Sequence, residues 1–286
     1  MSTTPYIVDA HHHVWELTVR DQDWITGPEL DPLRRDFTLS DLTPLARHEG
    51  VCASVVVQTV TAAEETMELL SLAAEHNIVR AIVGWTDLTA TDVTQEIGRL
   101  RELPGGQYLA GVRHQVQSEP DPDWLTRPDV LNGLRAVAAA GLVYDLIVLP
   151  HQLPAARRAV LEVPQLTFVL DHLGKPPIAS GAVEAWRGDL RRLAELPNVV
   201  CKLSGLVTEA DWARWTVNDL RACTETALDA FTPDRLMFGS DWPVCTLAAS
   251  YGDVVASARD LTRGLSPGEQ AAVWSGTATR VYTITH

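Results

Sequence analysis

Eight short apolar stretches recur along the chain, and longer stretches in which apolar residues return at helical spacing separate most of them. The short stretches are rich in Val, Ile and Leu and lack strict alternation with polar residues, as expected for strands buried on both faces. They cover residues 6–9, 54–58, 79–85, 109–114, 143–149, 166–171, 199–204 and 236–241. The clearest amphipathic helices are predicted over residues 62–76, 92–102, 128–140, 153–161, 186–196 and 211–231. This order predicts an α/β fold, specifically a (β/α)8 TIM barrel.

Length and composition are consistent with one barrel domain covering residues 1–286. A TIM barrel typically needs about 250 residues, and a chain with 46% hydrophobic and 21% charged residues can bury a large core. One segment departs from the regular alternation, because residues 15–36 are too many for an ordinary strand-to-helix connection. This segment contains Trp15 and Trp24, and long loops on the catalytic face of a barrel commonly form lids or substrate walls.

The formal net charge of −14 disfavours nucleic acid or an anionic membrane as a partner, because both carry negative charge. A small-molecule substrate is the better expectation. The start of the chain lacks a basic residue followed by an apolar stretch, and no segment reaches the roughly 20 uninterrupted apolar residues of a membrane span. We therefore expect a cytoplasmic protein. Its four cysteines lie far apart without a Cys-x-x-Cys pair, which favours buried free thiols over disulfides.

Three histidines follow the first predicted strand, in the sequence Asp9-Ala10-His11-His12-His13. Side chains alternate along an extended chain, so His11 and His13 share a face on which both imidazoles could bind one ion at about 2.0–2.1 Å. Such a run could also be a solvated loop or the remnant of a tag, but the apolar residues directly before it argue against a tag. We predict that His11 and His13 belong to a functional site.

Three more polar side chains end later apolar stretches, namely His151, His172 and Asp241. The carboxyl ends of all strands of a parallel barrel meet on one face, so these side chains are expected to lie near His11 and His13. Asp241 could bind a cation or accept a proton from water, although an aspartate could also cap a helix there. His172 could orient that water or protonate a leaving group.

The ordered set of motifs resembles the amidohydrolase superfamily, in particular the amidohydrolase-2 group of predicted metal-dependent TIM-barrel hydrolases. The resemblance rests on the Asp-x-His-x-His opening, on Asp-His-Leu-Gly-Lys-Pro at residues 171–176 and on Gly-Ser-Asp-Trp-Pro at residues 239–243. It extends over nearly the full chain. Within the group, Gly-Val-Arg-His at residues 111–114 and Cys-Lys-Leu-Ser-Gly at residues 201–205 are most similar to sugar-acid lactonases, such as those acting on fuconolactone or rhamnonolactone.

The resemblance implies a hydrolase that opens a lactone, with one divalent metal ion, expected to be zinc, held by His11, His13, His151 and Asp241 or a subset of them. Many members with two ions have a carboxylated lysine or a glutamate at the end of the fourth strand. This chain has Arg-His at that place, residues 113–114, so a bridged pair of ions is not expected. Related lactonases need no metal, so the same cluster could instead hydrogen-bond the lactone directly.

Six residues near the predicted strand ends are candidates for substrate binding: Arg113, His114, Lys175, Lys202, Trp15 and Trp242. The chain has only two lysines, and both lie at the predicted catalytic ends of consecutive strands. Arginine, lysine and histidine could donate hydrogen bonds to the oxygens of a polar ligand. Tryptophan could form apolar walls of the site, although tryptophan packed in a core is the commoner case.

The predicted mechanism has Asp241 accept a proton from a water molecule that attacks the ester carbonyl. Two alternatives remain at this point. One is a decarboxylase or hydratase of the same group that acts on an unsaturated or aromatic carboxylic acid, and the other is a barrel that binds a ligand without catalysis. The oligomeric state is also open, because the two tryptophans of residues 211–215 could pack against the barrel or against the second subunit of a homodimer.

Overall fold

The computed structural model describes residues 6–285, and its centre is one parallel sheet of eight strands in the order β1 to β8. The strands are β1 (Ile7–His12), β2 (Val51–Val57), β3 (Val79–Gly84), β4 (Leu109–His114), β5 (Val143–Leu146), β6 (Phe168–Leu170), β7 (Val199–Leu203) and β8 (Leu236–Phe238). Each overlaps a predicted apolar stretch, although β5 and β8 end three residues earlier than predicted. The predicted domain, residues 1–286, includes residues 1–5 and 286, which lie outside the described range.

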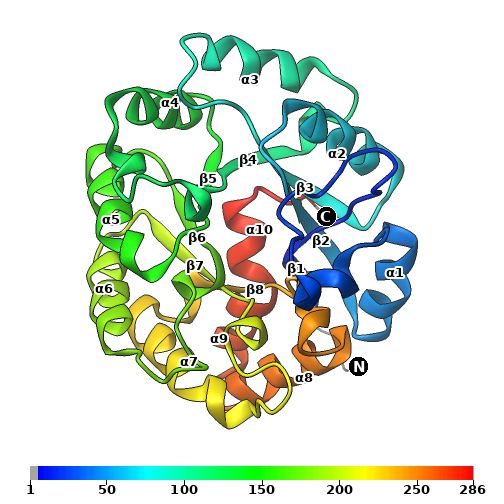
Figure 1. Cartoon of the computed structure of the whole chain (residues 1–286), viewed down its shortest axis with the longest axis vertical. Helices are drawn as coiled ribbons and strands as arrows, with labels where there is room; N and C mark the ends of the chain where they lie inside the picture. Colours follow the sequence, from blue (N-terminus) through cyan, green and yellow to red (C-terminus); the bar gives the residue numbers. More distant parts are fainter. Residues whose placement is uncertain (1–5, 286) are drawn as a thin grey trace.

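The segment after β8 returns to β1 and nearly closes the sheet into a barrel (Figure 1). The amide of Asp241 donates to the carbonyl of His11 at 2.8 Å, and the amide of His13 donates to the carbonyl of Trp242 at 2.7 Å. These bonds join residues at opposite ends of the sequence. They confirm the predicted TIM barrel and place the Asp-x-His-x-His segment beside Asp241.

The helices α1 to α8 form a ring around the sheet (Figure 1). The α-helices are α1 (Leu39–His48), α2 (Ala63–Glu75), α3 (Val93–Glu102), α4 (Pro128–Ala139), α5 (Leu153–Glu162), α6 (Glu184–Ala194), α7 (Val217–Phe231), α8 (Tyr251–Thr262), α9 (Pro267–Ala271) and α10 (Thr277–Val281). The six predicted helices overlap α2 to α7. However, α7 begins at Val217 rather than at residue 211, because the Asp219 carboxylate accepts hydrogen bonds from the amide and hydroxyl of Thr216 and caps the helix there.

The inside of the barrel has two layers of different chemistry. The lower layer consists of small and medium apolar side chains, among them Val8, Ala53, Val55, Ala81, Val143, Val169, Val200 and Met237. Helix α10, which crosses the barrel centre in Figure 1, packs against this layer through Ala278, followed by Tyr282. The upper layer contains Arg113, Asp145, Asp171 and Lys202, all fully or almost fully buried. Charged groups therefore lie directly beneath the carboxyl ends of the strands.

The long segment after β1 packs beside the barrel mouth through aromatic side chains. Trp15 and Phe37 exchange two backbone hydrogen bonds of 2.9 Å, and their rings lie 5.2 Å apart. Phe37 in turn contacts Trp242 edge-to-face at 5.4 Å. This aromatic group fixes the segment against the loop that carries Asp241, as expected for a substrate wall.

The cysteines are buried with one exception. All four cysteines are free, and Cys201, Cys223 and Cys245 are buried as predicted. Cys52 is exposed instead, because it lies on the one outward position of β2 that the helices leave uncovered. Between residues 6 and 285, no helix combines the length and apolar character that crossing a bilayer requires.

Candidate active site

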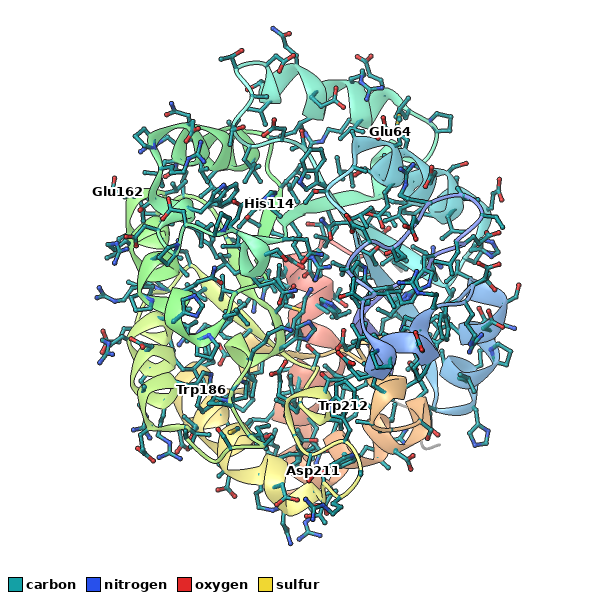
Figure 2. The ribbon with its side chains drawn as sticks, in the orientation of Figure 1. Glu64, His114, Glu162, Trp186, Asp211 and Trp212 are labelled. Carbon is teal, nitrogen blue, oxygen red and sulfur yellow. The ribbon has the colours of Figure 1, made fainter. Side chains whose placement is uncertain are left out.

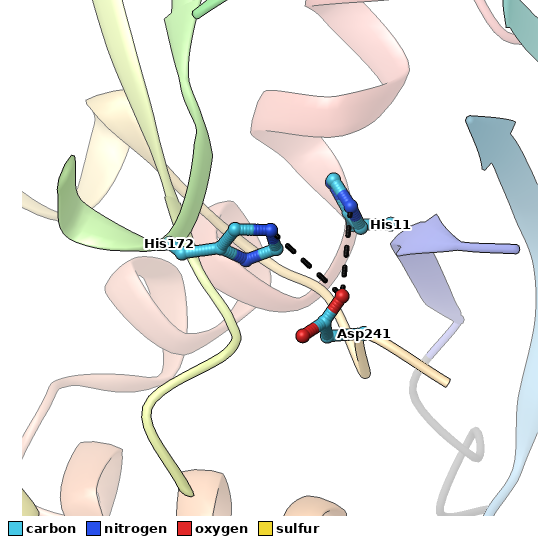
Figure 3. Close-up of side chains that lie close together, drawn as sticks. All are labelled: His11, His172 and Asp241. Carbon is cyan, nitrogen blue, oxygen red and sulfur yellow. Dashed lines mark ion pairs between the residues drawn. The ribbon is translucent and has the colours of Figure 1, made fainter. Parts of the chain in front are cut away.

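Four polar side chains meet where β1 ends and where the chain leaves β6 and β8. The Oδ1 atom of Asp241 lies 3.8 Å from Nε2 of His11, 3.6 Å from Nε2 of His13 and 3.8 Å from Nε2 of His172. The Nε2 atoms of His11 and His13 are 3.2 Å apart. Figure 3 shows the imidazoles of His11 and His172 directed at the same carboxylate oxygen. The structure therefore brings four of the five predicted central residues together.

Unusual backbone conformations hold this cluster in place. His172 and Asp241 both have positive φ, at 53° and 58°, a region that non-glycine residues rarely occupy and that is common at functional sites. Gly205 allows the close approach of His172, because a Cβ atom at this position would lie 2.5 Å from Nδ1 of His172. The buried carboxylate of Asp9 accepts hydrogen bonds from the amides of His11 and Ser240, so it ties both sides of the cluster together.

The protonation of the cluster follows from its hydrogen bonds and burial. Nδ1 of His13 donates to the carbonyl of Val57 at 2.7 Å, which leaves Nε2 of His13 with a lone pair. Burial lowers the pKa of His172 to about 4 and holds the pKa of His11 well below its usual value. Burial alone would raise the pKa of Asp241, but the nearby imidazoles of His172 and His13 outweigh it and lower that pKa. At neutral pH His11 and His172 are therefore neutral and Asp241 is a carboxylate.

This donor set fits a single divalent ion. Tetrahedral zinc with bonds of about 2.0–2.1 Å places its ligand atoms about 3.3 Å from one another. In this cluster, Oδ1 of Asp241 lies 3.6 to 3.8 Å from the Nε2 atoms of the three histidines, and the Nε2 atoms of His11 and His13 are 3.2 Å apart. His11, His172 and Asp241 can all offer atoms that lie within 4.8 Å of one another. The residues present therefore fit one ion without a large rearrangement.

A buried ionic layer supports the cluster from below. Nζ of Lys202 lies 2.5 Å from Asp145, 3.0 Å from Asp171 and 3.0 Å from Nδ1 of His11. Arg113 contacts the other oxygen of Asp171 at 3.0 Å. Although burial opposes ionisation, Lys202 and His11 hold the pKa of Asp171 well below its usual value. The two basic side chains, Arg113 and Lys202, thus pair with the two carboxylates, and Lys202 and Asp171 hold the Nδ1 atom of His11 in place.

A cavity of about 560 Å³ opens above the cluster, which is large enough for a small organic substrate. His13, His172, Asp241 and Arg113 line it together with Lys175 and Glu209, whose side chains form an ion pair of 3.4 Å. Trp24 and Trp212 contribute aromatic surface. His114 and Glu119 line it as well, and Figure 2 shows His114 and Trp212 on opposite sides of the barrel centre. The cavity thus joins polar and aromatic groups above four candidate metal ligands or proton acceptors.

Comparison with known proteins identifies the family to which this barrel belongs. The sequence model of the amidohydrolase family matches residues 8–284. The chain belongs to this amidohydrolase family. It is 42% identical to an L-fucono-1,5-lactonase of Burkholderia multivorans over 97% of this chain and 96% of that protein. An L-fucono-1,5-lactonase of Burkholderia ambifaria is 39% identical over 97% and 95% of the two chains. A solved amidohydrolase from Burkholderia multivorans with bound zinc is 40% identical, with a TM-score of 0.93, and covers 98% of this chain and 100% of that one.

Not every predicted residue lies in this amidohydrolase site. His151 is exposed in the turn after β5 and is absent from both the cluster and the cavity wall. The strand ends at Leu146, so the chain has already turned away from the barrel mouth before it reaches His151. This corrects the prediction of His151 as a metal ligand, and His172 takes its place in the candidate ligand set.

Three of the predicted substrate-binding residues are also corrected. Lys202 is completely buried within the ionic layer and does not line the cavity. Trp15 and Trp242 are buried against Phe37 and likewise lie behind the wall rather than on it. Arg113, His114 and Lys175 do line the cavity, and their role in substrate binding stays a prediction.

Four carboxylates around the site are not among the predicted site residues. Asp145 and Asp171 lie in or directly after apolar strands, and a carboxylate inside such a strand is a usable sign of a buried ion pair. Glu119 directly follows a short 3-10 turn after β4, and Glu209 ends a similar turn after β7, where the sequence shows only ordinary polar loops. Their importance becomes visible only when the fold places them around one cavity.

Proposed function

We propose that this amidohydrolase hydrolyses sugar-derived lactones. The observation that carries the proposal is its similarity, over nearly the whole chain, to two L-fucono-1,5-lactonases at 42% and 39% identity. The cavity agrees with this substrate class, because its mixture of hydrogen-bonding and aromatic side chains suits a polyhydroxylated ring. The histidines and the aspartate of the site lie at or just after the ends of strands β1, β6 and β8.

The charges around the cavity favour a neutral substrate over a carboxylic acid. Both cations that line it are paired: Arg113 with Asp171 at 3.0 Å, and Lys175 with Glu209 at 3.4 Å. Asp23 and Glu119 also line it. Apart from a bound metal ion, a carboxylate substrate would meet no unpaired cation among the described lining residues, whereas a lactone brings no charge. This argues against the alternative of a decarboxylase or hydratase that acts on carboxylic acids.

We propose zinc as the ion, held by Asp241 Oδ1 and by Nε2 of His11 and His172, with His13 next to them. A divalent ion bound here would supply a Lewis acid that polarises the lactone carbonyl. The Nδ1 atom of His11 lies 3.2 Å from Asp171, and a carboxylate in this position orients a metal-binding imidazole. Because His172 is neutral at pH 7, we assign it ligand binding rather than proton donation.

The proton transfers can be assigned to Asp241. Its Oδ1 atom faces the three imidazoles, which leaves Oδ2 to accept a proton from water while the water oxygen attacks the carbonyl carbon. The bond between that carbon and the ring oxygen then breaks, and Asp241 returns the proton to the leaving alkoxide. One water is consumed and a hydroxy acid forms, which releases one proton when it ionises. The carboxylates around the cavity favour departure of this anionic product.

A substrate panel tests the proposal. Purified protein is mixed in weak buffer with L-fucono-1,5-lactone, with a dicarboxylated pyrone or with a hydroxybenzoic acid. A pH indicator reports acid release from the sugar lactone and from the pyrone, which is also a lactone, and the rate of spontaneous hydrolysis is subtracted. Decarboxylation of the benzoic acid is followed by chromatography. We expect turnover of the sugar lactone, loss of that turnover after chelation and recovery with zinc. Turnover of either acidic compound with higher kcat/KM than the sugar lactone would contradict the proposal, as would no turnover of the sugar lactone.

A further inference from the structure

One wall of the cavity presents a carboxylate whose direction is fixed by a chain of contacts. Glu119 follows β4 and lines the cavity, and its Oε1 atom lies 2.7 Å from Nε2 of His114. The side chains of His114 and Glu119 are only 13% and 26% exposed. No lysine or arginine within residues 6–285 forms an ion pair with Glu119. This carboxylate therefore lines the substrate space without a lysine or arginine ion-pair partner, and Arg127 acts on it only from a longer distance.

The surroundings of His114 determine which nitrogen carries its proton. The indole N–H of Trp85 can only donate, and it lies 3.0 Å from Nδ1 of His114. Nδ1 must therefore be the acceptor, and Nε2 must carry the hydrogen that is donated to Glu119. Trp124 stacks on the same imidazole with ring centres 4.2 Å apart and planes 8° apart. His114 is thus held neutral, in one tautomer and one orientation.

This arrangement leaves one well-placed acceptor for a ligand. Oε1 of Glu119 is engaged by His114, and no side chain or backbone group of the described residues donates to Oε2. A fixed, charged acceptor in a cavity binds a hydroxyl group strongly, because hydrogen bonds to a charged partner are roughly twice as strong as neutral ones. Gln115 and Gln117 line the same wall, but the amide nitrogen of each already donates a hydrogen bond within the protein. The wall is therefore equipped to bind hydroxyl groups rather than an apolar ring.

We propose that Glu119, oriented by His114, binds a hydroxyl group of the lactone ring and selects polyhydroxylated lactones over unsubstituted ones. The inference rests on the proposed lactonase function and assigns the part of the site that distinguishes among lactones. In this account His114 is a positioning residue that acts through Glu119, rather than a direct donor to substrate.

The test compares two six-membered lactones, L-fucono-1,5-lactone and δ-valerolactone, through the ratio of their kcat/KM values. A neutral amide is a weaker acceptor than a carboxylate, so Glu119→Gln should lower this ratio about 10- to 100-fold. Glu162→Gln is the matched control, because Glu162 lies on the outer helix α5, far from the cavity (Figure 2). It should leave the ratio unchanged.

A second variant tests the positioning role of His114. Trp85→Phe removes the N–H that fixes the tautomer, and it should lower the same ratio by a smaller factor, about 2- to 10-fold. If Trp85 acts through His114 and Glu119, adding Trp85→Phe to Glu119→Gln should change the ratio by less than about 2-fold. A general structural effect would instead lower the ratio equally in both backgrounds. Should Glu119→Gln fail to fold, Trp85→Phe alone decides the matter.

The possible outcomes separate this inference from the proposed function. A wild-type protein that hydrolyses neither lactone contradicts the proposed function itself. An active Glu119→Gln variant whose ratio stays within about 2-fold of wild type contradicts only the role of Glu119.

Discussion

Replacing Lys202 with methionine should destabilise the fold strongly, because it removes the cation that two buried carboxylates share. Nζ of Lys202 lies 2.5 Å from Asp145 and 3.0 Å from Asp171, and all three side chains are fully buried. At an effective dielectric constant of about 20, each attraction is worth roughly 5–7 kcal/mol before desolvation is subtracted. Removing one partner of a buried ion pair typically costs about 3–5 kcal/mol. We expect a loss of that size in the free energy of unfolding.

The measurement is urea unfolding followed by tryptophan fluorescence, with chelator present so that metal binding does not contribute. Lys175→Met is the matched control, since the Lys175–Glu209 pair is partly exposed and should contribute less than about 1 kcal/mol. Combining Lys202→Met with Asp145→Asn should recover at least about 1 kcal/mol, because one uncompensated carboxylate is gone. A Lys202→Met variant within about 1 kcal/mol of wild type, or a double variant with purely additive losses, would refute the counterion role.

Three further predictions concern the ligands, the backbone and pH. His172→Ala should reduce bound zinc measured by elemental analysis, whereas exposed His151→Ala should match wild type; equal loss in both would contradict the ligand set. Gly205→Ala should lower kcat roughly 10- to 100-fold, because the new Cβ displaces His172; an unchanged kcat would argue against this packing. Burial lowers the pKa of His114 below 6.5, so the unfolded chain binds a proton first as pH falls. Below pH 6.5, the free energy of unfolding of wild type, measured with urea, should therefore fall relative to that of His114→Asn by at most about 1.4 kcal/mol per pH unit. The same dependence of this free energy on pH in both proteins would refute the prediction.

The barrel could be predicted from sequence because its strands are buried on both faces and therefore appear as short apolar runs. His11, His172 and Asp241 were found by the same logic, since each lies at a strand end or within three residues of one. His151 shows where that logic fails. It lies five residues beyond the end of β5, and the apolar residues Ile147 to Leu149 continue the strand-like pattern after the strand has ended.

The ionic layer could not be predicted because its partners are far apart in sequence. Lys202 looked like a residue at the mouth of the barrel, but it points into the barrel, where Asp145 and Asp171 neutralise it. The contact between Tyr282 and Asp145 depends on the C-terminal segment returning beneath the strands. Likewise, the sequence predicts His114 as a substrate-binding residue but does not reveal its contacts with Trp85 and Glu119, which come from other parts of the chain or from the following loop.

The most direct test of the central claim is the turnover of L-fucono-1,5-lactone by Asp241→Asn at saturating zinc, with bound metal measured on the same sample. An amide cannot accept the proton from the attacking water, so kcat should fall about 10²- to 10⁴-fold. KM should change much less than kcat, because the other residues that line the cavity, Glu119 among them, are untouched. A folded, metal-loaded Asp241→Asn protein with near-normal kcat would contradict the assignment of Asp241 as the proton acceptor of a lactonase.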